Sequence, residues 1–350
     1  DLVRSRGLGD VYKRQNMLLT MRSTVEEAYR APDHSASAVT KAMAKGALMG
    51  ARGNSGVILS QILRGIAQRL EGKESITATD LAEALQISAA LAYKGISNPT
   101  EGTILTVIKD VANAVKEKIA RNGSDLVALL EAAVNAAGES VANTPKLLKV
   151  LREAGVVDAG GQGLYTILEG SLRYLTGEAE QMQFRKPQII VSDLPATKLP
   201  QMIAADEIPY GYCTEFLLKG EGIDSDKIRK KLEKKGESLI VVGDESAVRI
   251  HIHTLDPGEV LTYAGGLGTM HQVSIRNMDE QHQSFLEMQK ERAPAIDTAI
   301  IAVVSGDGLA DVFTSLGVSA IVPGGQTMNP STKDLLQAAE LVPSEKVIIL

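Results

Sequence analysis

The sequence has no tryptophan, few aromatic residues and one cysteine among its 350 residues. Aromatic side chains make up 3% of it, so any core must be built mainly from Ala, Leu, Ile, Val and Met. One cysteine excludes a disulfide within the chain and favours a reducing compartment. The net charge of -6 lacks the positive excess that general nucleic-acid binding needs. The longest apolar run of the last third, Ala299 to Val304, is too short to cross a bilayer, and we therefore expect a cytoplasmic protein.

Asp1 to Gln15 differ from the rest of the chain. They contain no starting methionine, no amphipathic period and no apolar core typical of a signal peptide. They resemble translated adapter sequence of the kind found at the ends of assembled environmental reads. We expect residues 1–15 to be non-native and native sequence to begin at Asn16; a basic arm for an acidic partner is the functional alternative.

A helical pattern runs from Asn16 to about residue 180. Apolar residues recur three or four positions apart, as at Leu18, Met21 and Val25. Thr79-Asp80 and Ser124-Asp125 have the residue types that begin helices. The pattern predicts helices near residues 17–30, 35–50, 55–71, 79–95, 101–121, 125–143, 145–154 and 161–177, and hence an all-α domain over residues 16–180.

Two further regions have strand patterns. Residues 189–191, 213–218, 239–242, 248–253 and 272–275 alternate or run apolar, and Asp224 and Pro257 begin helices between them. We therefore expect an α+β middle domain over residues 186–291 and a linker at 289–294. After residue 295, strands at 299–304, 320–322 and 346–350 alternate with helices at 309–316 and from 332, which predicts a parallel sheet. Because so few strands cannot bury both faces, residues 295–350 are expected to be an incomplete α/β domain of a truncated chain.

Three glycine-rich turns precede predicted helices, at residues 50–56, 95–103 and 155–163. The start of a helix offers unpaired N–H groups and the positive end of the helix dipole, which attract phosphate. Glycine lets the backbone approach a ligand closely. The same residues are typical of ordinary helix caps, so each turn alone leaves both interpretations open.

The order of the helices places the first two turns at the same end of the domain. In an up-and-down array, successive loops alternate between the two ends, and two helices separate these turns. The residues before Asn16 lie at that end by the same argument. The third turn joins them only if residues 143–145 kink the chain instead of reversing it, which the sequence leaves open.

These turns carry a resemblance to a known family. GARGNSGVILSQILRG (residues 50–65), PTEGTILTV (99–107) and GVVDAGGQGL (155–164) resemble the dihydroxyacetone kinase L-subunit-like domain. The chain after Gln15 resembles the ATP-binding subunits of bacterial fatty acid kinases. The resemblance implies a multidomain fold in which an all-α helical barrel binds ATP and Mg2+ at one rim, followed by an α+β domain and an α/β domain. It implies nucleotide-binding roles for Asn16, Gly53, Asn54, Ser55, Gly56, Gly102, Thr103, Asp158, Gly160 and Gly161.

One part of the family's pattern is missing. The family has an Asp-Gly-Asp-Thr-Gly loop, whose aspartates ligate Mg2+, directly before the Asn-Met-Leu-Leu found here as Asn16 to Leu19. Residues 1–15 stand in that place. Because phosphoryl transfer depends on metal ions to neutralise charge, we expect no catalytic residue in this chain and an almost inactive polypeptide. Magnesium-dependent phosphoryl transfer by the chain would contradict this expectation.

Cys213 and the His251-Ile252-His253 segment lie in predicted strands. Residues two apart on a strand face the same side, so the two imidazoles converge, and a thiolate from a neighbouring strand completes a set suited to Zn2+. Glu215 or water is a candidate fourth ligand. A buried apolar cysteine beside a polar strand face is the alternative. The resemblance favours a metal, because the family's middle domain has Cys and His residues at these places.

The resemblance implies one half of a two-component kinase. ATP binds the helical domain, and a separate fatty-acid-binding protein presents a fatty acid whose carboxylate becomes an acyl phosphate. Asp307 and residues 324–327 follow predicted strands, where α/β sheets place ligands, and the resemblance implies that this domain helps engage the partner; ordinary loop residues are the alternative. A dihydroxyacetone-type kinase for a small polyol, which would end near Gly177, and a non-catalytic nucleotide- or metal-sensing scaffold stay open. A homodimer also stays open, and nucleic acid is not an expected partner.

Overall fold

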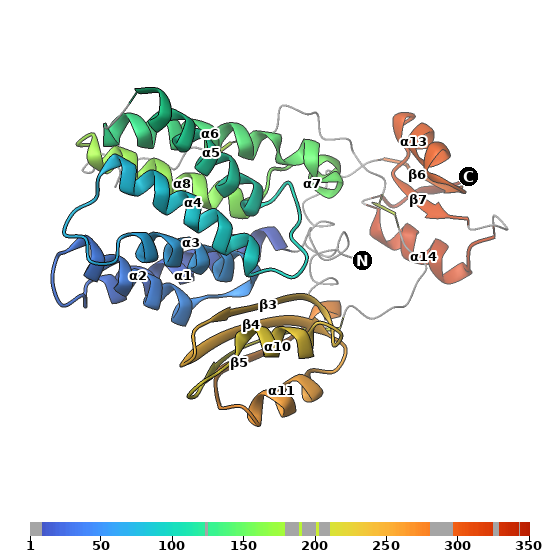
Figure 1. Ribbon diagram of the computed structural model, residues 1–350. Helices are drawn as coiled ribbons and strands as arrows, with labels where there is room; N and C mark the ends of the chain where they lie inside the picture. Colours follow the sequence, from blue (N-terminus) through green and yellow to red (C-terminus); the bar gives the residue numbers. More distant parts are fainter. Residues whose placement is uncertain are drawn as a thin grey trace.

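The computed structural model describes residues 9–122, 125–178, 189–190, 201–202, 211–280, 297–324, 329–342 and 344–350. These residues form a helical domain, an antiparallel sheet with two helices, and a parallel sheet with two helices (Figure 1). The predicted order of all-α, α+β and α/β regions is therefore confirmed. Residues 1–8 and the predicted linker at 289–294 lie outside the described residues, and the domain boundaries stay predictions.

Successive helices of the helical domain pack on one another until the ring closes. Contacts run from α1 to α6 in order, then from α6 to α8 and from α8 back to α1. The interior is filled by aliphatic side chains such as Leu59, Ile62 and Ile108, none more than 2% exposed. No helix in the described part of the chain has the length and hydropathy to cross a membrane. The helices are α1 (Gly9–Ala28), α2 (Ala36–Gly50), α3 (Gly53–Arg69), α4 (Ala78–Lys94), α5 (Ile104–Asn122), α6 (Leu126–Leu147), α7 (Lys149–Ala154) and α8 (Ala159–Leu175).

Helix α1 begins earlier than the sequence pattern predicts. The pattern predicts a helix from residue 17 and separates residues 1–15 from the fold, but α1 starts at Gly9 and continues without interruption to Ala28. The added residues contain no proline after Gly9, and extending an existing helix costs far less than starting one. Residues 9–15 are therefore helical despite their weak amphipathic pattern.

Pro145 does not separate two helices as expected. It lies inside α6, which ends at Leu147, and the short α7 follows after Leu148. Pro145 has no N–H to donate to the carbonyl of Val141, four residues earlier. The hydroxyl of Thr144 donates to that carbonyl instead, at 2.7 Å. Thr144 thus allows α6 to continue through the proline.

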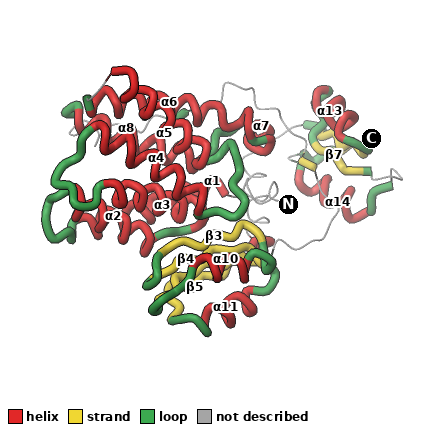
Figure 2. Tube along the Cα trace, viewed as in Figure 1, coloured by secondary structure: helices red, strands yellow, loops and turns green. Residues whose placement is uncertain are grey.

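The middle region is a four-stranded antiparallel sheet in the order β3-β4-β2-β5. Helices α10 and α11 pack on this sheet, α10 against β3 and α11 against β2 and β5. Figure 2 shows that the strands of the protein gather in two groups outside the helical ring. The elements are β2 (Tyr212–Lys219), α10 (Ser225–Leu232), β3 (Glu237–Gly243), β4 (Ala247–Thr254), α11 (Pro257–Gly265) and β5 (Thr269–Asn277).

The two faces of this sheet have different roles. Val248, Ile250 and Ile252 of β4 belong to an apolar cluster that the residues of α10 and α11 share. Because side chains alternate along a strand, the residues between and after them face the other way. Those residues are Arg249, His251 and His253. Ile240 and Val242 of β3 share that second face and pack against Ala51 and Val57 of the helical domain.

The last region is a parallel sheet in the order β1-β7-β6-β8, with α13 (Asp307–Ser315) and α14 (Thr332–Leu341). The predicted strands are present as β6 (Ala299–Val304), β7 (Ala320–Pro323) and β8 (Val347–Ile349). The fourth strand, β1 (Gln201–Met202), precedes β2 in the sequence, lies within the range predicted for the middle domain, and was not predicted.

The strand expected at residues 189–191 is not found at its described positions. Ile189 and Ile190 have no strand assignment, and residue 191 lies outside the described residues. Ile190 packs on the helical core, and its N–H donates to Gln162 Oε1 at 2.9 Å. The side chain of Gln162 therefore takes the place of a neighbouring strand.

Candidate functional site

The glycine-rich turns meet at one end of the helical ring. A Cβ atom built on Gly160, in the first turn of α8, would lie 3.3 Å from Ser55 Oγ and 3.3 Å from the Cβ atom of Ile104. Ser55 belongs to the first turn of α3, and Ile104 begins α5 directly after Thr103. The starts of α3, α5 and α8 therefore form one rim.

The third turn reaches this rim because α6 continues through Pro145 to Leu147 instead of ending in a reversal of the chain at residues 143–145. Asp158 N–H donates to Thr144 Oγ1 at 3.0 Å, and Asp158 Oδ2 accepts from Gly161 N–H at 2.8 Å. A Cβ atom on Gly102, in the second turn, would lie 3.0 Å from the carbonyl oxygen of Thr144. The end of α6 thus contacts the second and the third turn, and the third turn lies at the same end of the domain as the first two.

Helix α1 completes the rim at Gly53. This residue has φ +55°, and a Cβ atom on it would lie 2.4 Å from Asn16 Nδ2. Nearby, Arg52 N–H donates to Thr20 Oγ1 of α1 at 3.3 Å. Both its backbone conformation and the close approach of Asn16 therefore require glycine at position 53.

Several amides of the predicted nucleotide-binding residues already have partners. Gly56 N–H donates to the carbonyl of Arg52 at 3.1 Å, within the helix. Gly102 N–H donates to Thr106 Oγ1 at 2.8 Å. A Cβ atom on Gly56 would also lie 2.4 Å from Thr20 Oγ1, so this glycine allows α1 and α3 to approach. At these positions glycine has a clear role in packing and capping.

Asn54 and Ser55 retain groups that a phosphate could bind. Their amides lie in the first turn of α3, where a helix offers no internal acceptor. Asn54 Oδ1 is buried, and in the described part of the chain it has no hydrogen-bond partner. As an acceptor, this oxygen could take a hydrogen-bond donor or a metal ion, whereas a phosphate could bind only the two amides.

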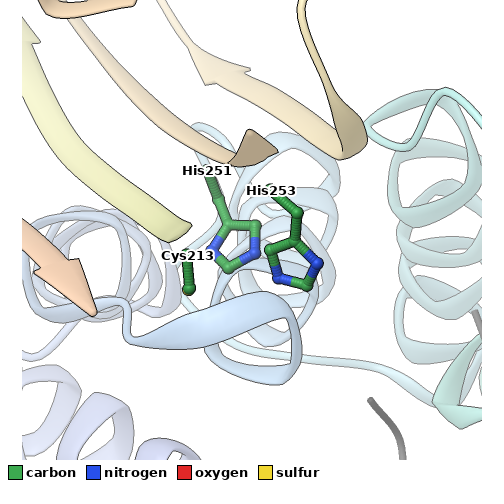
Figure 3. A group of neighbouring side chains, drawn as sticks. All are labelled: Cys213, His251 and His253. Carbon is green, nitrogen blue, oxygen red and sulfur yellow. The ribbon is translucent and has the colours of Figure 1, made fainter. Parts of the chain in front are cut away.

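Cys213 and two histidines form a compact group on the middle-domain sheet (Figure 3). Cys213 of β2 pairs with His253 of β4 in the strand register, and His251 lies two residues earlier on the same face. One candidate ligand atom from each residue lies within 4.8 Å of the other two. Figure 3 shows the two imidazole rings beside each other, with Cys213 next to His251. The structure thus brings the three predicted metal ligands together.

The surroundings of this group fit a bound cation. His251 is 2% exposed, yet neither of its ring nitrogens has a hydrogen-bond partner among the described residues. Burial lowers the pKa of His253 to about 3, so its imidazole is in the neutral form that ligates metals. Burial also raises the pKa of the Cys213 thiol to about 11, an effect that a divalent cation would oppose by stabilising the thiolate.

Glu215 lies beside the group but has partners of its own. It is 3% exposed, and it accepts hydrogen bonds from Gly53 N–H at 2.9 Å and from Arg276 Nη2 at 3.0 Å. Its Oε2 atom is 3.8 Å from His251 Nδ1. Burial by itself raises the pKa of Glu215, but His251, the Gly53 amide and Arg276 outweigh burial and lower it to about 2. An ionised carboxylate therefore separates the Cys/His group from the first glycine turn.

Arg249 holds the other side of that turn. It is 1% exposed, its Nη2 donates to the carbonyl of Ala51, and its Nη1 donates to Gln272 Oε1 at 3.0 Å. Neither Arg249 nor Arg276 was predicted from the sequence as a site residue. The sequence contained a signal for Arg249, because Arg249, His251 and His253 are spaced two residues apart and so share one face of a predicted strand. No comparable pattern marked Arg276.

We expect Arg249→Met to loosen the contact between the sheet and the helical ring. The substitution leaves the buried carbonyl of Ala51 without its donor, which costs about 1–3 kcal/mol. Thermal unfolding should show a lower Tm and separate transitions for the two domains. Arg64→Met is the matched control, because Arg64 Nη1 donates to the Gly243 carbonyl across the same contact from an exposed position, at 2.7 Å. Equal effects of the two substitutions would contradict the role given to Arg249.

The described residues do not offer an acidic cluster for magnesium at the rim. Asp158 caps α8, and Glu215 is held by Gly53 and Arg276. Within the described ranges, the one group of three metal-ligating side chains is Cys213, His251 and His253. The described residues of the rim therefore do not by themselves supply a magnesium site.

Sequence comparisons agree with this arrangement. The DAK2 domain matches residues 8–173, the middle domain of FakA-like fatty acid kinase proteins matches residues 209–285, and their C-terminal domain matches residues 299–350. An uncharacterized protein of Staphylococcus haemolyticus (strain JCSC1435) is 40% identical over 349 residues, covering 96% of this chain and 63% of the relative. An uncharacterized protein of Staphylococcus aureus (strain USA300) is 40% identical over 346 residues, covering 96% of this chain and 62% of the relative. The chain thus spans less than two thirds of these relatives, and with its DAK2, middle and C-terminal domains in this order it belongs to the FakA-like family of fatty acid kinase proteins.

Proposed function

We propose that this chain is the ATP-binding part of a phosphotransferase that acts on the carboxylate of a fatty acid. A separate fatty-acid-binding protein presents the fatty acid, and the product is an acyl phosphate. Membership of the FakA-like fatty acid kinase family supports this substrate class. The observation that carries the proposal is the meeting of Ser55, Ile104 and Gly160, which gathers three helix starts at one rim.

The chain's own residues contribute binding and orientation. The amides of Asn54 and Ser55 and the positive ends of the helix dipoles hold the phosphates of ATP. We expect little turnover from this chain itself, because it lacks the aspartates that ligate Mg2+ in the family. In a relative that has them, a carboxylate oxygen forms a bond to the γ-phosphorus, the bond between that phosphorus and its bridging oxygen breaks, and ADP leaves. Magnesium, when bound, neutralises phosphate charge.

We also propose that Cys213, His251 and His253 bind Zn2+. One thiolate and two imidazoles are typical zinc ligands, and a fourth position is left for water or another ligand. The unpartnered nitrogens of the buried His251 support this proposal. Bound zinc would hold β2 and β4 together next to the first glycine turn.

Titration calorimetry tests the two halves of the proposed function separately. The purified chain should bind ATP in the presence of Mg2+, and it should bind a fatty-acid-binding protein loaded with fatty acid. Failure to bind ATP would contradict the kinase proposal. Binding of ATP together with dihydroxyacetone, and not of the acyl-loaded protein, would favour the small-polyol alternative.

A further inference from the structure

Side chains from two strands of the middle-domain sheet, β2 and β4, form hydrogen bonds with the backbone at the start of α3. Gly53 N–H donates to Glu215 Oε2 at 2.9 Å, and the carbonyl of Ala51 accepts from Arg249. These contacts fix the backbone on both sides of Arg52, the residue that precedes the helix. Because Asn54 and Ser55 follow directly, the direction of their amides depends on these two hydrogen bonds.

Glu215 also faces the Cys/His group. It lies two residues after Cys213 on β2, on the same face, and it is opposite His251 in the register with β4. The oxygen that accepts from Gly53 is the one that lies 3.8 Å from His251 Nδ1. A single carboxylate oxygen therefore contacts the nucleotide-binding turn and a candidate metal ligand.

A cation in the group would stabilise this carboxylate. A charge that is 3% exposed needs compensating charge or hydrogen bonds to stay buried. Arg276 supplies part of the compensating charge for Glu215, but its side chain is 31% exposed. A cation bound to Cys213, His251 and His253 adds positive charge at short range. Without the cation, keeping the Glu215 carboxylate at Gly53 costs more free energy.

We infer that Glu215 is a positioning residue through which the metal site controls the nucleotide-binding turn. The inference rests on the proposed function, which assigns the phosphates of ATP to the amides of Asn54 and Ser55 and zinc to the Cys/His group. In the zinc-loaded protein the carboxylate holds Gly53 N–H and so presents the amides of Asn54 and Ser55. When zinc leaves, the carboxylate withdraws and the turn loses one of its two anchors. Zinc and ATP therefore raise each other's affinity.

ATP affinity, measured with and without zinc, tests this coupling. We expect removal of zinc by a chelator to weaken ATP binding to the unaltered chain about tenfold. In Glu215→Ala both forms should bind ATP weakly, with nearly equal affinity. With excess Zn2+ present, the zinc content of this variant should stay at that of the unaltered chain, since Cys213, His251 and His253 all remain. A purely structural role would lower the stability of Glu215→Ala and leave the zinc effect on ATP affinity unchanged.

Glu215→Gln is a second variant, which tests the coupling even if Glu215→Ala misfolds. Glutamine has the same shape and can accept from Gly53 N–H, but it has no charge to attract the cation. The zinc-loaded variant should therefore keep most of its ATP affinity, while the effect of zinc falls well below the roughly tenfold ratio. Glu221→Ala is the control, because Glu221 is an exposed glutamate of the same domain and should leave the ratio unchanged.

The outcomes separate this inference from the function on which it rests. ATP binding that zinc does not affect in the unaltered chain would overturn the coupling alone. A full zinc effect that persists in both Glu215 variants would overturn the role of Glu215. Absence of ATP binding from every form would contradict the proposed function itself, and the coupling with it.

Discussion

Gly53→Ala should weaken ATP binding by more than about tenfold, equivalent to about 1.4 kcal/mol. Gly53 has φ +55°, a conformation that costs other residues roughly 1–2 kcal/mol. The added Cβ atom would also lie 2.4 Å from Asn16 Nδ2, so the Asn16 side chain or the start of α3 must move. A change of backbone conformation at residue 53 displaces the amides of Asn54 and Ser55, which follow directly, from the rim. Titration calorimetry with ATP measures the loss, and thermal unfolding measures the cost in stability.

Gly72→Ala is the matched control for this substitution. Gly72 has φ +72°, but a Cβ atom on it would have no neighbour within 4 Å. The control therefore carries the same kind of backbone strain, about 1 kcal/mol, without a collision and away from the rim. Its Tm should fall while its ATP affinity stays unchanged. If the two variants bound ATP equally well, the contact between Gly53 and Asn16 would have no part in nucleotide binding.

The helices and strands could be predicted because their signals are local. The spacing of apolar residues gave α2, α3, α4 and the strands of the middle sheet to within a few residues. The continuation of α6 through Pro145 could not be predicted from proline alone, because it depends on the hydroxyl of Thr144. β1 is two residues long and pairs with β7, more than a hundred positions later, so its own pattern carries almost no signal.

The candidate site was predictable in part for the same reason. His251 and His253 share a strand face through local alternation, and only the pairing with β2 was needed to add Cys213. The packing of the sheet on the first glycine turn is different, because it joins Gly53 to Glu215 and Ala51 to Arg249, pairs 162 and 198 residues apart. No local pattern indicates which strand meets which turn. That contact is nevertheless what connects the two halves of the candidate site.

The purified chain should contain about one zinc ion, and Cys213→Ser should lose it. Serine keeps the size of the side chain but replaces the thiolate ligand with a hydroxyl, which zinc binds far less well. Metal analysis by mass spectrometry measures the zinc content, and thermal unfolding should show a lower Tm for the variant. His271→Asn is the control, because His271 is an exposed histidine on the neighbouring strand β5 and should leave zinc bound.

Cys213→Ala separates the two interpretations of this cysteine. Cys213 is 7% exposed, so it could serve only as a small apolar side chain of the sheet. Alanine preserves most of that role, and in that case its Tm should change little and neither protein should contain zinc. If Cys213 is a metal ligand, alanine and serine should both remove the zinc and destabilise the sheet to a similar extent. The ring nitrogen of His251 that ligates zinc would then be buried without a partner, and bound zinc removes that free-energy cost.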